Sequence, residues 1–168
     1  MSPRTTLVTH LFACWDALYR CLGEGAPHVT DDAYVVALHE ASRNFGSVAL
    51  GLREILSSEV PEPLAVIERV LRDALARDAS GALAIYATTM VVGPRLLVTL
   101  LDARAEADDD LRELLDRAAQ VTVAELRALA TVLHDQSELA DPAWQTAARG
   151  LTELVEASGN AESFVFSR

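Results

Sequence analysis

The sequence predicts an all-α fold, built as a single-domain bundle of about six helices. Ala, Leu, Glu and Arg dominate the chain, apolar residues recur at helical spacings of three and four, and strand-like alternation of β-branched residues is nearly absent. At 168 residues, of which 51% are hydrophobic, the chain is long enough to form one sizeable core. No linker is long enough to divide it, so we expect one domain over residues 1–168.

The first predicted helix runs from about Thr5 to Leu22 and stops at the segment 23–27, where a glycine can form a left-handed C-cap. Its apolar arc is wider than the ~100° that a surface helix usually buries. One stripe of this arc comprises Leu7, Leu11, Cys14, Leu18 and Cys21, and the other comprises Val8, Phe12, Trp15, Tyr19 and Leu22. We expect a homodimer held partly by Phe12, Trp15 and Tyr19, with burial inside the chain as the alternative.

The second predicted helix begins after Thr30 or Asp31 as N-cap and continues to about Ser57. It carries an apolar seam with heptad-like spacing and a flank of small or apolar residues beside it. The seam consists of Tyr34, Leu38, Ala41, Phe45, Val48, Leu52 and Ile55, and the flank of Val35, His39, Ser42, Gly46, Ala49 and Leu50. A third helix follows the proline-containing segment 59–63 and ends near Arg77.

The fourth predicted helix lies in the most apolar part of the chain. From Ala79 to Leu101 there is one charge, Arg95, next to Gly93 and Pro94. An apolar segment this long predicts the central helix of the bundle, buried almost all round and broken at the proline. Ser80 is placed to cap it. The segment is also long enough to span a membrane, but Arg95 would cost about 2.5–3.5 kcal/mol there, so we expect no membrane span.

The fifth predicted helix begins at the acidic run 108–110, which favours the positive end of the helix dipole. It extends to about Ser137, with softening at the β-branched segment 121–123. The sixth opens with Asp141 as N-cap and Pro142 at the first helical position, and ends near residues 158–159.

The C-terminal residues 158–168 are expected to form an extended tail. Phe164 and Phe166 would be costly to leave in water, because each exposes a large apolar ring. The tail is therefore either an interaction strap or a frayed end.

Composition indicates the compartment and excludes two partner classes. The chain has 25 acidic and 14 basic residues, a net charge of −11, and no basic cluster, so we expect neither nucleic acid nor an anionic membrane as partner. Cys14 and Cys21 lie seven residues apart on one predicted helix, roughly 10 Å, which forbids a disulfide between them. Residues 1–9 lack the features of a signal peptide, so we expect a cytoplasmic protein.

The candidate metal ligands have simpler explanations. His10, Cys14 and Cys21 share one helix side, but a tetrahedral site needs a fourth ligand such as His28 or His39, and cysteine packs readily as a small hydrophobe. The sequence contains no Glu-x-x-His step, which di-iron bundles require. His134 could chelate a metal together with Asp135 or Glu138, but a histidine in the last turn of a helix more often interacts with the helix dipole. The acidic runs 30–32 and 108–110 are explained by helix capping. We therefore predict no metal site.

Pro94 marks the predicted binding site. Proline cannot donate to the carbonyl of Met90, so the helix should kink or restart, and a restart would leave free amides beside Arg95. Such a site suits a small amphipathic anion with a carboxylate or phosphate head. The residues predicted to line it are Tyr86, Met90, Val91, Pro94, Arg95 and Leu97. Alternatively, Arg95 pairs with an internal acid such as Asp16 or Asp102, or extends to the surface.

The sequence has no phosphate loop, Cys-x-x-Cys motif or nucleophile elbow, so no reaction and no cofactor is indicated. We expect a non-enzymatic, homodimeric binding protein that acts through a small amphipathic ligand or a protein partner. The alternative is a small metal-dependent helical enzyme whose histidines and acids are brought together by folding.

Overall fold

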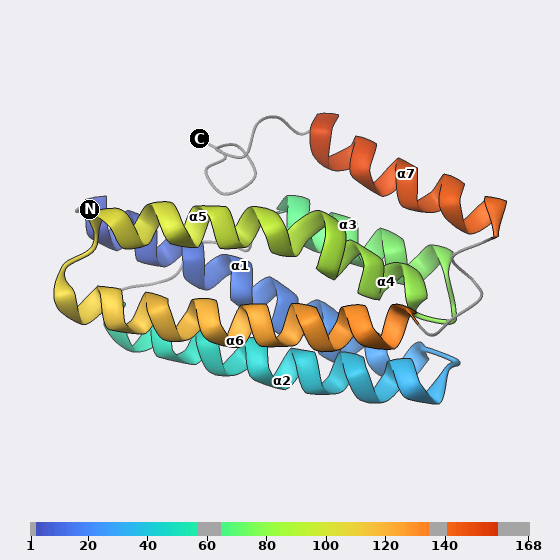
Figure 1. The fold of residues 1–168 in the computed structure, drawn as a ribbon, viewed down its shortest axis with the longest axis horizontal. Coiled ribbons are helices and arrows are strands. Elements are labelled where there is room, and N and C mark those ends of the chain that lie inside the picture. The colour runs from blue at the N-terminus through green and yellow to red at the C-terminus, as the bar shows by residue number, and fades with distance from the viewer. Residues whose placement is uncertain (1–2, 57–64, 135–140, 158–168) are drawn as a thin grey trace.

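A computed structural model describes residues 3–56, 65–134 and 141–157, and within these ranges it contains helices and no strand (Figure 1). The helices are α1 (Pro3–Gly25), α2 (Asp32–Ile55), α3 (Ala65–Arg77), α4 (Ala82–Tyr86), α5 (Gly93–Glu106), α6 (Asp109–His134) and α7 (Pro142–Ala157). A 3₁₀ turn, Ala26–His28, follows α1, and a π-helical segment, Ala87–Val92, joins α4 to α5 without a break. The predicted all-α bundle is confirmed. Because α4, the π segment and α5 are contiguous, they form one long helix, and the described residues contain six separate helices in all.

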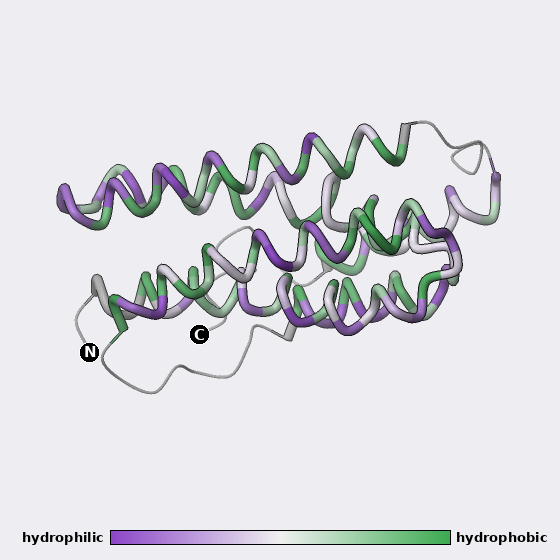
Figure 2. The backbone as a smooth tube through the Cα atoms, turned by 90° about the horizontal axis from the view of Figure 1, so that it is seen from below, coloured by the Kyte–Doolittle hydropathy of each residue, from purple (hydrophilic) through white to green (hydrophobic). Residues whose placement is uncertain are grey.

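The helices pack around one core, with α1 against α2 and α3, and α6 against α2 and α5 (Figure 1). The last helix, α7, lies across α3, α4 and the π segment. Within most helical turns, hydrophobic positions lie on one side and hydrophilic positions on the other (Figure 2), as expected for helices with one buried and one solvated face. The core therefore comes from the amphipathic periodicity that predicted the bundle.

Local capping follows the sequence at three helix starts. Oδ1 of Asp31 accepts hydrogen bonds from the amides of Ala33 and Tyr34 at 2.9 and 3.2 Å. Oδ1 of Asp108 accepts from the amide of Leu111 at 3.0 Å, and Asp141 caps α7 in the same way. These side chains replace backbone acceptors that the first turn of a helix lacks, so local chemistry sets these boundaries.

The start of α4 differs in detail from the prediction. The N-cap position is Gly81, whose φ of 93° is in the left-handed region. Ser80 still contributes, since its hydroxyl accepts from the amide of Ala82 at 3.2 Å, while Oδ2 of Asp78 accepts from the amide of Leu83 at 2.8 Å. A Cβ at Gly81 would also lie 2.8 Å from the side chain of Val29. Glycine is required there by both conformation and space.

The predicted left-handed C-cap after Leu22 is wrong. Helix α1 continues to Gly25, which has right-handed helical angles (φ −79°, ψ −35°), and the 3₁₀ turn extends it. The glycines here serve helix packing instead. A Cβ at Gly23 would lie 2.7 Å from Oγ of Ser42, and one at Gly25 would lie 2.4 Å from the side chain of Leu75. They let α2 and α3 approach α1 closely.

The expected softening of the fifth predicted helix at residues 121–123 is also wrong, because α6 is continuous from Asp109 to His134. Thr122 is buried, and its hydroxyl donates to the carbonyl of Ala118 at 2.7 Å. The same oxygen accepts a hydrogen bond from Nε1 of Trp15 at 3.1 Å. Tertiary contacts thus hold a segment whose β-branched residues have lower helix propensity.

The structure places most of the predicted dimer stripe inside the chain. Trp15 is fully buried and Phe12 almost fully, whereas Tyr19 remains 46% exposed. The wide apolar arc of α1 is explained by its position between α2 and α3. The stripe therefore supplies core contacts, and two of its three side chains are not available for a subunit contact.

Candidate functional site

The six residues of the predicted anion site face different surroundings. Val91 is buried in the core, whereas Met90 and Pro94 are exposed. The half-buried ring of Tyr86 packs edge-to-face on Trp144, with ring centroids 5.2 Å apart. Leu97 and Arg95 are half-buried. The ligand role of these residues stays a prediction.

The backbone around Pro94 remains helical. Val92 and Gly93 both have right-handed helical angles, and Pro94 is the second residue of α5. The amide of Gly93 donates to the carbonyl of Thr88, five residues earlier, as in a π-helix, so this amide is not free for an anion. A shift to π-helical bonding directly before the proline is the local response to its missing amide.

Arg95 is engaged by this same segment. Its Nη1 donates to the carbonyl of Val91 at 2.7 Å. Asp16, one proposed partner, instead pairs with Arg20 at 2.8 Å, and among the described residues Arg95 makes no ion pair with an acid. A half-exposed guanidinium carries little of the penalty of a buried charge. Replacing Arg95 should therefore not carry the large stability cost of breaking a fully buried ion pair.

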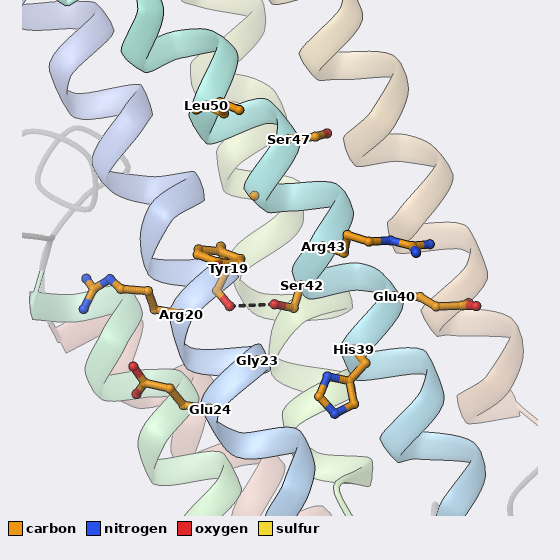
Figure 3. A pocket seen from close by; sticks show the side chains of 11 residues that line it. Tyr19, Arg20, Gly23, Glu24, His39, Glu40, Ser42, Arg43, Ser47 and Leu50 are labelled. Carbon is orange, nitrogen blue, oxygen red and sulfur yellow. Dashed lines mark hydrogen bonds between the residues drawn. The ribbon is translucent and has the colours of Figure 1, made fainter.

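A groove of about 890 Å³ lies at a different place, between α1 and α2 (Figure 3). Both helices contribute to its wall. The residues that line it are Tyr19, Arg20, Gly23, Glu24, His39, Glu40, Ser42, Arg43, Gly46, Ser47 and Leu50. We take this groove as the candidate site, because it is concave and combines apolar and charged side chains.

Small residues form the floor of the groove, because α1 and α2 approach closely there. The hydroxyl of Ser42 donates to the carbonyl of Tyr19 at 2.7 Å (Figure 3). The ring of Tyr19 lies over Gly46, where a Cβ would be 2.8 Å from a ring carbon. Leu50 is 61% exposed farther along α2. An aromatic face and an aliphatic side chain therefore offer water-exposed apolar surface within one groove.

Some of the charged side chains around this apolar surface form ion pairs, and others do not. Arg20 pairs with Asp16, and Glu24 accepts a hydrogen bond from Nη2 of Arg72 at 3.3 Å. Arg43 is exposed and makes no ion pair with an acid within the described residues. In Figure 3 the side chains of Arg20 and Arg43 extend in opposite directions away from Tyr19, Arg20 from α1 on the side of α3 and Arg43 from α2 on the side of α6. Of the two arginines that line the groove, Arg43 is thus the one without an ion pair in the described part of the chain.

Sequence reasoning did not find this groove, although it placed His39, Ser42, Gly46 and Leu50 on one flank of the second helix. The signal was the pair of small residues on that flank: Ser42 lies against Gly23 of α1, and Gly46 lies against the ring of Tyr19. Which helix they face is a tertiary fact. The groove therefore became visible only once α1 and α2 were docked.

The two cysteines are buried structural thiols, as predicted. Burial raises the pKa of Cys14 far above its usual value and raises the pKa of Cys21 to about 11. No group of three His, Cys, Asp or Glu side chains that could hold a metal ion occurs in the described ranges. Asp135 and Glu138 of the possible chelate lie outside them. Both cysteines are therefore assigned to the core.

We expect these thiols to be protected in the folded protein at pH 8 and to react fully in urea, as measured with a chromogenic disulfide reagent. Unfolded thiols ionise near pH 8.5, whereas the folded protein keeps the proton on Cys21 up to about pH 11. Protons are therefore lost on unfolding in this range, and stability should fall as pH rises from about 8.5 towards 11. A decline of the same size in Cys21→Ala would contradict this assignment.

The stretch Ala82–Glu106 is long and apolar enough to cross a membrane, and 67% of its most apolar window is buried inside the bundle. Core helices of soluble proteins have the same property, so this finding is weak support for a membrane span. The cytoplasmic location stays a prediction.

No protein-family model, curated protein or solved structure matches this chain, so the chemistry of its own residues is the basis for assigning a function.

Proposed function

We propose that this protein is a non-enzymatic, helical-bundle binding protein that takes a small amphipathic anion into the groove between α1 and α2. One observation carries the proposal: the lining of a single groove combines exposed apolar surface from Tyr19 and Leu50 with two arginines, Arg20 and Arg43. Binding sites for small molecules are typically concave and mostly apolar, with a few polar groups that fix the orientation of the ligand.

The proposed division of roles follows from the surroundings of each side chain. The apolar body of the ligand would cover the ring of Tyr19 and the side chain of Leu50, displacing water from both. The anionic head would pair with Arg43, since Arg20 is already held by Asp16. Gly46 matters because any larger residue would displace the ring that forms the wall.

Electrostatics favour this groove over most of the surface. The chain has a net charge of −11, so an anion is repelled on average. The groove is lined by two arginines and by Glu24 and Glu40, and Glu24 is partly neutralised by Arg72. The sequence predicted the same class of ligand beside Arg95, and we propose the groove in its place.

A direct test is the titration of the protein with anilinonaphthalene sulfonate, followed by displacement with dodecanoate. We expect Arg43→Glu and Leu50→Asp each to weaken binding of both probes at least about tenfold, or about 1.4 kcal/mol. Both side chains are exposed, so the fold should not change. Circular dichroism checks this.

Matched controls separate the groove from general charge and surface effects. Val36→Asp alters another exposed apolar side chain of α2, and Arg149→Glu makes the same charge change on α7, and neither residue lines the groove. Both controls should bind the probes like the wild type. If instead Arg95→Glu abolishes binding while the groove variants bind normally, the site beside Pro94 is the correct one.

A further inference from the structure

Helix α5 and the π segment before it present an apolar stripe to solvent. Met90, Val98 and Leu101 are 60%, 53% and 57% exposed, and Pro94 and Ala105 are also exposed. Positions 94, 98, 101 and 105 follow the alternating spacing of four and three that places residues on one helix face. The stripe contains no charge, although the chain carries 39 charged side chains, 25 acidic and 14 basic. A continuous exposed stripe of this kind marks an interaction surface.

The charges beside the stripe are arranged to complement a copy of themselves. Arg95 and Asp102 lie seven residues apart, so they occupy the same heptad position on one edge of the stripe. Two turns of helix separate them by roughly 10 Å, too far for a pair within one helix. Arg95 is half-buried and Asp102 exposed, and within the described residues neither forms an ion pair. In an antiparallel pair of identical helices, equivalent edge positions of this kind face each other across the seam.

We infer that the occupant of this stripe is a second copy of the chain, packed through α5 about a two-fold axis with the two α5 helices antiparallel. Val98 of each copy then packs against Leu101 of the other, and Pro94 against Ala105. Arg95 of each copy pairs with Asp102 of the other, so one contact occurs twice by symmetry. This surface replaces the dimer contact expected on α1, whose Phe12 and Trp15 are buried in the core.

The inference is independent of the proposed ligand groove, because the stripe lies on α5 and the groove between α1 and α2. Charge complementarity is what favours a second copy. A membrane would bury Arg95 and Asp102 unpaired beside the stripe. The tail of residues 158–168, with Phe164 and Phe166, is the other candidate occupant, and it lies outside the described residues.

The test is sedimentation equilibrium of the full chain and of four variants at several concentrations. We expect a dimer for the wild type. Val98→Asp places a charge in the seam and should weaken association at least about tenfold, shifting the equilibrium toward monomer. Arg95→Asp should weaken association, because two acidic groups then meet at each edge. The double variant Arg95→Asp with Asp102→Arg should restore it, since the pair is re-formed with its charges exchanged. Val36→Asp on α2 is the matched control and should leave the dimer unchanged.

Three outcomes would overturn the inference. One is a wild type that stays monomeric up to about 100 μM, a concentration at which a specific dimer should form. Another is a monomer that dimerises after removal of residues 158–168, which would identify the tail as the occupant. The last is a dimer that resists both Val98→Asp and Arg95→Asp, or that Val36→Asp disrupts. If Arg95 only stabilised the fold through its hydrogen bond to the carbonyl of Val91, the double variant would lack that bond too. Its dimerisation would then not recover.

Discussion

Replacing Trp15 with alanine is expected to lower the free energy of unfolding by about 3–5 kcal/mol. The indole is fully buried in the core and connects α1 to α6 through its hydrogen bond to Thr122, so truncation removes a large apolar contact and leaves a cavity. Urea denaturation followed by circular dichroism measures the change.

Two further variants serve as comparisons for Trp15→Ala. Thr122→Val keeps the side-chain volume but leaves Nε1 of Trp15 without its acceptor, and we expect a smaller loss of about 1–3 kcal/mol. Tyr19→Ala, on the same helix, should cost much less, because Tyr19 is 46% exposed. A Trp15→Ala protein as stable as Tyr19→Ala would mean that Trp15 is not a core residue.

Replacing Gly93 with alanine is expected to destabilise the fold by about 1–3 kcal/mol, although alanine is the better helix former. The added Cβ would lie 2.5 Å from a methyl carbon of Leu126 and 2.7 Å from the carbonyl oxygen of Thr88, the group that accepts the hydrogen bond from the amide of Gly93. The leucine can rotate away, but the carbonyl belongs to the π-helical backbone. Either the π segment or the contact between α5 and α6 must shift.

Gly150 provides the matched control for Gly93. It also lies inside a helix, α7, but a Cβ there would come no closer than 3.9 Å to Arg77, the nearest neighbour. Gly150→Ala should therefore stabilise the protein by about 0.5–1 kcal/mol through helix propensity alone. Thermal denaturation of the two variants compares them directly. An equal gain in stability for both would show that Gly93 is not held in a close contact.

Several features could be predicted because they depend on neighbours in the sequence. Asp31, Asp108 and Asp141 cap helices as expected, since a cap requires a side-chain oxygen within three residues of free amides. The seam of α2 is buried from Tyr34 to Leu52, because helical periodicity places those residues on one face. At its end, Ile55 is 38% exposed, since no other helix covers that turn fully.

Other features could not be predicted, because they depend on which helices become neighbours. Gly23 and Gly25 look like a helix stop in the sequence, yet they remain helical where α2 and α3 approach α1. The candidate groove has the same origin, since Tyr19 meets Gly46 only through the packing of α1 on α2. The small residues Ser42 and Gly46 were visible in the sequence of α2, but nothing in that helix alone showed which helix they would face.

The sequence by itself determined that this protein is an all-α bundle, where most of its helices begin, and which faces of those helices are apolar. Each of these depends on a spacing of three or four residues, over which the helix fixes the geometry. Tertiary structure decided which apolar faces are covered. Trp15 lies inside because α6 supplies Thr122 as a partner, whereas Val98 and Leu101 stay exposed because no described helix packs over them. The apolar character of a side chain shows that its burial is favourable, but the surface that buries it lies elsewhere in the chain or on another molecule.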